Sequence, residues 1–352
     1  MRPRVEDLGI ALYHKGAFSR IIGKSAASVL MSDGLDILGM ARLGRKLLRM
    51  PDREALYRMS LADAVDRFSI SPKVERFLRA MGIGLFVNPD PESISAGEIF
   101  SYLALSAGKL GRVAYPLGGW KTIWTALERA VYSRDNGEVR FGEEVEKLEI
   151  EGGRVRACVT GKERYEAESF VCAFPGRLLL EKGIVPDGAF SDDLADRLKG
   201  CRPVYGLNLD MALKRDVIDS SDLVFTVDPP SLAICPTEVE PSLLPRGYTL
   251  LTLFTPFGTE MPDKAEVERA REMLLGLYEE MFPGLGKATY EMMPAVVPVI
   301  SAHVSTDFCY PDRPQVKCPD VENLFFIGDW TRARGAGCEI AFDSAMKCFG
   351  CL

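Results

Sequence analysis

The sequence predicts a two-lobed protein that combines an α/β lobe with an α+β lobe, and three observations lead to this class. Apolar residues recur at helical spacing over residues 5–111, between prolines that open or end helices. Short strand patterns begin after Pro116. The last 30 or so residues read as an apolar strand, a glycine turn and a helix, which together build a nucleotide-binding crevice. A chain of 352 residues suffices for about two domains.

Local patterns predict the elements in order. Ser60 opens a capped amphipathic helix, a second helix covers residues 72–81, and Gly118-Gly119 leads into a third that runs through Ala130. Strands are predicted at residues 139–141, 145–150, 155–160 and 170–173, with Gly152-Gly153 as a hairpin turn.

The segment from about residue 186 to 306 is strand-rich. Strands are predicted at residues 204–213, 223–227 and 248–254, and a long helix at residues 264–281. The predicted segments are therefore residues 1–109, 110–177, 178–305 and 306–352. The second and fourth form the α/β lobe, and the first and third form the helical and mixed-sheet parts of the other lobe.

Composition excludes several classes of function. The net charge is −7 with both signs interspersed, so nucleic acid is not an expected partner. An odd count of nine cysteines without a signal peptide predicts mostly buried thiols in a reducing, cytoplasmic compartment. Two histidines exclude a histidine-rich metal site, and no metal is expected. No apolar stretch reaches the ~20 residues of a membrane-spanning helix.

One helical pattern leaves two readings open. Residues 43–50 place Arg45, Lys46 and Arg49 beside apolar residues, which suits a solvated surface helix and also suits peripheral contact with a membrane.

The strongest chemical pattern is NLFFIGDWT at residues 323–331, followed by GAGCEIAFDSA at residues 335–345. The strand delivers Gly328 and Asp329 to its carboxyl end, where a carboxylate can accept hydrogen bonds from ribitol or ribose hydroxyls. Gly335 and Gly337 let backbone N–H groups at a helix N-terminus approach a phosphate or an electron-rich ring. The alternative is that these glycines serve only tight packing.

These two runs resemble the C-terminal FAD motif of the phytoene desaturase and flavin amine oxidase superfamily. The resemblance implies that Asp329 binds the ribitol and diphosphate region of FAD, and that the helix with Gly337, Glu339 and Ala341 points at the flavin ring. Ile340 and Ala345 stand where the family often has glycine.

The middle of the chain carries a second resemblance to this superfamily. YPLGGW at residues 115–120 and CAFP at residues 172–175 are similar to its middle block, which ends at Pro175. The resemblance implies that the backbone of Val145 contacts adenine. The run DPESIS at residues 90–95 is similar to the family's helical substrate lobe, so the resemblance covers most of the chain.

The dinucleotide fingerprint GxGxxG does not occur after a first strand in this sequence. The Rossmann-like lobe is therefore expected to be incomplete, with an open sheet edge beside residues 323–327. The chain alone is expected to bind FAD weakly or not at all. Completion by an N-terminal FAD-binding partner chain or by further sequence is the expectation, so that the chain is a truncated product or one subunit of a split enzyme.

Three functions stay open at this point. The first is an FAD-dependent oxidoreductase that transfers a hydride from a C–H bond to flavin, acting on an apolar isoprenoid or lipid-like molecule or on an amine. The second is a non-enzymatic lipid- or protein-binding protein similar to GDP dissociation inhibitors. The third is a nonfunctional remnant. The apolar segments at residues 250–257 and 292–300 are candidates for the substrate pocket or for core strands, and no catalytic acid or base is assigned.

Overall fold

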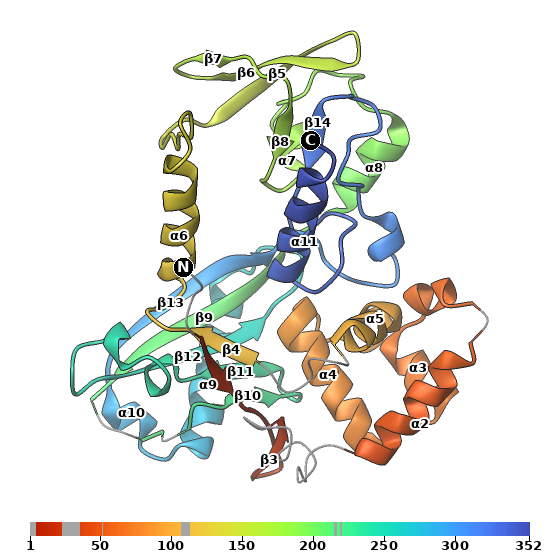
Figure 1. Ribbon diagram of the computed structural model, residues 1–352. Helices are drawn as coiled ribbons and strands as arrows, with labels where there is room; N and C mark the ends of the chain where they lie inside the picture. The colour runs from red at the N-terminus through yellow and green to blue at the C-terminus, as the bar shows by residue number, and fades with distance from the viewer. Residues whose placement is uncertain (1–4, 23–35, 51, 107–112, 215–216, 219) are drawn as a thin grey trace.

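The computed structural model describes residues 5–22, 36–50, 52–106, 113–214, 217–218 and 220–352 (Figure 1). The predicted boundary at residue 109 and the helical prediction for residues 23–35 lie outside this part of the chain. Among the described helices, none combines the length and the apolar character needed to cross a membrane.

A mixed sheet of seven strands forms the centre of the α+β lobe, in the order β13-β9-β12-β11-β10-β2-β3. Only β10 and β2 run parallel; the other neighbours are antiparallel. Three of the predicted strands become β9, β10 and β12. The strands are β2 (Ile10–His14), β3 (Ala17–Ile22), β9 (Val204–Leu213), β10 (Leu223–Thr226), β11 (Ser231–Ile234), β12 (Thr249–Pro256) and β13 (Thr289–Ile300).

Helix α9 (Lys264–Met281) has the predicted bounds and packs against this sheet. Asp263 and Glu266 form a capping box at its start, each accepting a hydrogen bond of 2.8 Å from the backbone N–H of the other. Leu274 and Tyr278 are fully buried among side chains of β9 and β12. Strand β12 is therefore a core strand, whereas β13 is an edge strand with much of its surface exposed.

The helical prediction is wrong for residues 5–22, which form three strands. β1 (Val5–Leu8) pairs with β4 (Val113–Pro116), and β2 and β3 form a hairpin whose turn residues Lys15 and Gly16 both have positive φ. Ile10 and Leu12 are buried in the hydrophobic core. The hairpin is stabilised by the pairing of β2 with β10, which lies more than 200 residues away in the sequence. The periodicity of a short stretch of sequence carries no information about such a distant partner.

Residues 36–106 are largely helical, as predicted. The Ser60 hydroxyl accepts a hydrogen bond of 3.0 Å from the Asp63 N–H and caps the predicted helix. One large core joins these helices to β2 and β10. The helices, seen in orange in Figure 1, are α2 (Ile37–Leu48), the 3-10 helix η1 (Glu54–Arg58), α3 (Leu61–Phe68), α4 (Pro72–Phe86) and α5 (Ala96–Ser106).

The α/β lobe brings together two distant parts of the chain. β8 (Phe170–Cys172) and β14 (Leu324–Phe326) pair in parallel, with Phe170 opposite Leu324. Above them in Figure 1 lies a three-stranded antiparallel sheet whose predicted hairpin turn, Gly152-Gly153, has φ of +59° and +71°. Its strands are β5 (Val145–Glu151), β6 (Arg154–Thr160) and β7 (Arg164–Tyr165). The strand predicted at residues 139–141 does not form, and Phe141 is 76% exposed.

The sequence predicts an open sheet edge beside residues 323–327, whereas in the structure the open edge lies on another strand. The backbone N–H groups of Phe326 and Cys318 donate across the outer edge of β14, to Val316 O (2.7 Å) and Leu324 O (3.0 Å). That edge is therefore occupied by residues 316–318. Among the described strands β8 pairs with β14 alone, so the open edge belongs to β8.

Helix α6 (Lys121–Tyr132) stands apart from the other helices (Figure 1) and has no buried residue. Trp120 and Trp124 are 49% and 58% exposed, and Leu127 lies on the same side of the helix. The remaining helices are α7 (Leu178–Glu181), α8 (Asp192–Gly200), α10 (Leu285–Ala288), α11 (Cys338–Phe349) and the 3-10 helices η2 (Pro236–Glu238), η3 (Pro241–Leu243) and η4 (Tyr310–Asp312).

Candidate functional site

Strand β14 ends in a turn that only glycine can make. Gly328 has φ of +137°, and a Cβ at this position would lie 2.6 Å from Nε1 of Trp330. Asp329 follows, half-buried, and its Oδ2 accepts a hydrogen bond of 2.8 Å from the backbone N–H of Ser301. The carboxylate therefore joins the carboxyl end of β14 to the end of β13.

Helix α11 begins at a second glycine with a special backbone conformation. Gly337 has φ of 52° and ψ of −124°, which residues with a side chain rarely adopt. The buried Ser344 hydroxyl accepts a hydrogen bond of 3.0 Å from the Gly328 N–H and donates to Ala341 O. Ser344 thus fixes α11 against the turn that carries Asp329.

Asp329 and Gly337 line one small cavity. Its other walls are apolar and come from Leu85, Phe86, Ile300, Ala302, Val304 and Ile340. The cavity volume is about 10 Å³, room for about one water molecule. Ile340, at a position where the family often has glycine, is 2% exposed and closes this space. A flavin ring does not fit inside this cavity.

The other predicted site residues lie in the same lobe, outside this cavity. Glu339 is exposed, and its carboxylate accepts from the Ala336 N–H at 3.4 Å. Ala341 and Pro175 are half-buried, on α11 and just after β8. Val145 begins β5 opposite Thr160. The structure therefore brings Gly328, Asp329 and Gly337 together and leaves the role of Val145 a prediction.

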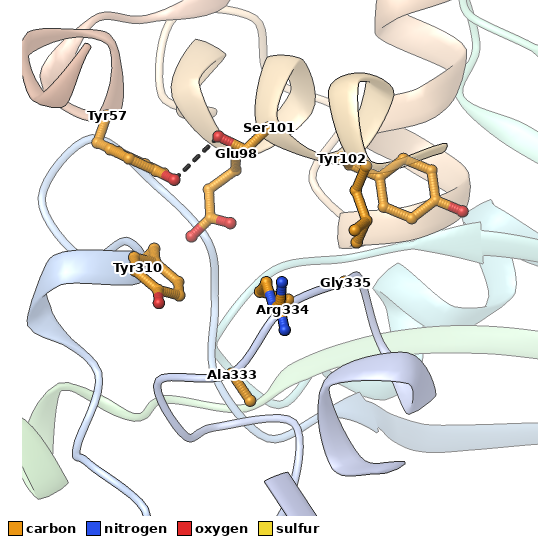
Figure 2. Close-up of a pocket in the computed structure, with 9 residues that line it drawn as sticks. Tyr57, Glu98, Ser101, Tyr102, Tyr310, Ala333, Arg334 and Gly335 are labelled. Atoms are coloured by element: carbon orange, nitrogen blue, oxygen red, sulfur yellow. Dashed lines mark hydrogen bonds between the residues drawn. The ribbon is translucent and has the colours of Figure 1, made fainter. Parts of the chain in front are cut away.

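A second, larger cavity was not found from the sequence. It has a volume of about 340 Å³ and lies between α5 and the loop that precedes α11 (Figure 2). The carboxylate of Glu98 reaches into it and forms an ion pair of 2.6 Å with Arg313, and both side chains are almost fully buried. Burial raises the pKa of Glu98, and Arg313 opposes that rise. The sequence signal for this cavity is Glu98, a charged residue in the otherwise apolar helix at residues 96–106.

The residues present fit one end of FAD. Asp329 has a second carboxylate oxygen with no partner among the described residues, and the buried Trp330 Nε1 beside Gly328 likewise lacks an acceptor there. A hydroxyl-rich chain that both accepts and donates hydrogen bonds suits these groups. In the described part of the chain, neither β8 nor β14 is followed by the glycine-rich loop that holds a diphosphate.

A parallel strand pair that ends on a glycine–aspartate turn, joined to a mixed-sheet lobe, is the arrangement of a two-lobed nucleotide-binding fold. The chain belongs to the family of flavin containing amine oxidoreductases, whose profile matches residues 6–348. No curated protein matches the chain in sequence.

Solved structures share this fold at low sequence identity. An oxidoreductase from Methanosarcina mazei is 18% identical with a TM-score of 0.73, over 99% of this chain and 81% of that one. Cyclohexylamine oxidase from Brevibacterium oxydans is 13% identical with a TM-score of 0.65, over 99% and 81% of the two chains. A putrescine oxidase double mutant is 10% identical with a TM-score of 0.68, over 99% and 82%.

Proposed function

We propose that this protein is the substrate-binding and ring-binding part of an FAD-dependent oxidoreductase that removes a hydride from a substrate C–H bond. The observation that carries the proposal is the junction of Gly328, Asp329 and the start of α11, held together by Ser344 and Ser301. When bound, FAD supplies the hydride acceptor. The chain's own residues position the cofactor and exclude water.

Individual residues have distinct proposed roles in holding FAD. The free oxygen of Asp329 accepts a hydrogen bond from a ribityl hydroxyl, and the N-terminus of α11 at Gly337 faces the ring. The backbone of Val145 contacts the adenine. Because Oδ2 of Asp329 is already engaged by Ser301, the side chain is held in one orientation before the cofactor binds.

The substrate class is proposed from the walls near the turn. Leu85, Phe86 and Ile300 make the walls beside Asp329 apolar. The cavity of about 10 Å³ that they enclose is too small for a substrate, so it is the apolar character of these walls that favours an isoprenoid or lipid-like molecule. An amine is the second candidate, because two proteins with this fold are named as oxidases of cyclohexylamine and putrescine.

The diphosphate-binding loop is proposed to come from polypeptide outside these 352 residues, either as further sequence or as a separate chain. Three surfaces support this. The β8 edge is open beside Val171, which is 42% exposed. Helix α6 has no buried residue although Trp124 and its neighbours form an apolar side. Helix α11 exposes Phe342, Met346 and Phe349 at helical spacing. A βαβ unit offers a strand for the edge and helices for these sides.

The test is complementation. A polypeptide with a GxGxxG βαβ unit from a flavin amine oxidoreductase is fused to this chain or co-expressed with it, and flavin retained after purification is measured. The proposal expects retention only in the completed protein. In β8, Phe170 and Cys172 bond to β14, so the Val171 N–H points to the open edge. Val171→Pro removes that donor and is expected to abolish retention, whereas Val171→Ala keeps it. Equal retention by both variants would contradict docking at β8.

A further inference from the structure

Helix α2 presents a basic face to solvent. The helix contains Arg42, Arg45 and Lys46 but no acidic residue, and Arg49 follows as its C-cap. The three arginines are exposed and are spaced by three and four residues, so they form one stripe along the helix. Leu43 is buried on the opposite side, in the core of the helical lobe. In Figure 1 α2 lies at the outer margin of that lobe.

The arginines of this stripe have no carboxylate partner. None of the three forms an ion pair with a residue that the structure describes. Arginines on other surfaces of the protein commonly do so: Arg154 lies 2.7 Å from Glu322, and Arg197 lies 2.8 Å from Asp193. The uncompensated charge of the stripe therefore favours a polyanionic partner.

The charged groups beside the stripe are engaged within the protein. The carboxylate of Asp36, the N-cap residue, accepts hydrogen bonds from the Gly39 N–H at 2.7 Å and the Ser71 hydroxyl at 2.6 Å. The Lys46 ammonium group donates to Phe68 O and joins α2 to the end of α3. Asp36 offsets one positive charge at the start of the helix, so the surplus lies in its C-terminal half.

Apolar side chains accompany the basic stripe. Leu38 lies four residues before Arg42 in the same stripe and is 70% exposed, and Leu48, three residues after Arg45, is 73% exposed. Arginines and exposed leucines on one helix are typical of helices that lie in a membrane interface, where the cations bind headgroups and the leucines enter the acyl boundary. A nucleic acid is bound through its phosphates by the charges and leaves the leucines in water.

We infer that α2 is a docking surface for a bilayer that contains anionic lipids. Arg42, Arg45 and Arg49 bind the anionic headgroups, and Leu38 and Leu48 insert beside them. The helical lobe then faces the membrane. This inference concerns binding alone and does not depend on flavin.

The test is co-sedimentation of the purified full chain with vesicles. One set contains phosphatidylcholine with roughly 30% phosphatidylserine, and the other contains phosphatidylcholine alone. The chain is expected to bind the anionic vesicles at least about tenfold more tightly at about 0.1 M salt, and to lose most of this preference at about 1 M salt, where the charges are screened. Equal binding to both sets, or no binding to either, would overturn the inference.

A charge variant locates the surface. The triple change Arg42→Gln, Arg45→Gln and Arg49→Gln is expected to lower the affinity for anionic vesicles about a hundredfold, since each arginine contributes roughly fivefold. Because all three side chains are exposed, the variant should fold, and its melting temperature checks this.

The matched control removes the same charge from three exposed arginines on other parts of the chain: Arg134→Gln, Arg246→Gln and Arg269→Gln. It is expected to retain most of the affinity. Equal affinities of the two triple variants would overturn the assignment to α2, because binding would then come from net charge or from another face.

A second variant distinguishes a bilayer from a soluble polyanion. Leu38→Gln combined with Leu48→Gln keeps every charge and is expected to lower vesicle affinity about tenfold, because the inserted apolar surface is lost. Binding to heparin, a soluble polyanion, should stay the same. Undiminished vesicle binding by this variant would assign the face to a soluble polyanion such as a nucleic acid and overturn the inference.

Discussion

The Asp329 carboxylate accepts one hydrogen bond from the Ser301 N–H, and we propose that it accepts a second from the cofactor. Its position after an apolar strand could be predicted from the sequence, because the GD pair follows NLFFI directly. Its contact with Ser301 could not, because the two residues are 28 positions apart and meet only when β13 and β14 converge.

We predict that Asp329→Ala lowers the free energy of unfolding by about 1–3 kcal/mol, since the Ser301 N–H loses its acceptor. In the completed, flavin-binding protein the same change should weaken flavin affinity by roughly tenfold to a hundredfold. Asp329→Asn retains an acceptor oxygen and should keep more of the stability. Urea unfolding and a flavin titration measure the two effects, and unchanged flavin affinity in folded Asp329→Ala would remove the assignment.

Gly337 provides a purely conformational test. An added Cβ would meet only Leu85 O at 3.8 Å, so space is not limiting, but φ of +52° is strained for alanine. Gly337→Ala should therefore cost about 1–3 kcal/mol of stability. Gly276 is the control: it lies inside α9, exposed and with open space around it, and Gly276→Ala should stabilise by about 0.5–1 kcal/mol. Equal effects of the two changes in thermal unfolding would contradict this account of the turn.

Glu98 and Arg313 form the most buried ion pair described. Arg313→Ala should destabilise the fold by about 3–5 kcal/mol, because it leaves the Glu98 carboxylate without its cation. Arg79→Ala is a suitable comparison, since the Asp228 partner of Arg79 is 72% exposed, and it should cost less than about 1 kcal/mol. Chemical unfolding of both variants distinguishes these values, and a similar small loss in each would contradict a larger contribution from the buried pair.

At the scale of elements, the sequence predicts what local signals specify. Helix α9 matches its predicted bounds because Asp263 and Glu266 form a capping box and Pro283-Gly284 follows its end. The β2–β3 hairpin was missed because its strands are short and their pairing partner is β10. Lys15-Gly16 was the available signal for a two-residue turn.

The loop after β13 predicts a dependence of stability on pH. Burial and the nearby Arg202 lower the pKa of His303 below 6.5. The unfolded chain therefore binds a proton at a higher pH than the folded chain does. The contribution of neutral His303 to the free energy of unfolding is complete above about pH 6.5. It is lost as the pH drops from there through the pKa of His303 in the folded chain.

The prediction is checked by measuring the free energy of unfolding between about pH 7.5 and pH 5. His303→Gln should flatten the slope, and His14→Gln, at the exposed end of β2, controls for the loss of an imidazole. A slope that is unchanged in His303→Gln would exclude this residue as its source.

At the scale of the whole molecule, the family and its two lobes could be predicted from motif order, and the arrangement of surfaces could not. The sequence placed the open sheet edge at β14, but residues 316–318 occupy that edge and β8 is open instead. The cavity at Glu98 draws its walls from η1, α5, η4 and the loop before α11. No local pattern brings those four segments together, so the cavity requires the tertiary structure.

The central claim is that these residues hold the ring and ribityl end of FAD but not its diphosphate. The most direct measurement is the ratio of flavin to protein, read from the absorption spectrum of protein purified with and without a completing βαβ unit. The account predicts a colourless protein from residues 1–352 alone, because the contacts of Asp329 and the α11 N-terminus do not offset the cost of immobilising a dinucleotide. It predicts near-stoichiometric flavin in the completed protein, lost with Val171→Pro. A yellow protein with near-stoichiometric flavin from residues 1–352 alone would contradict the account.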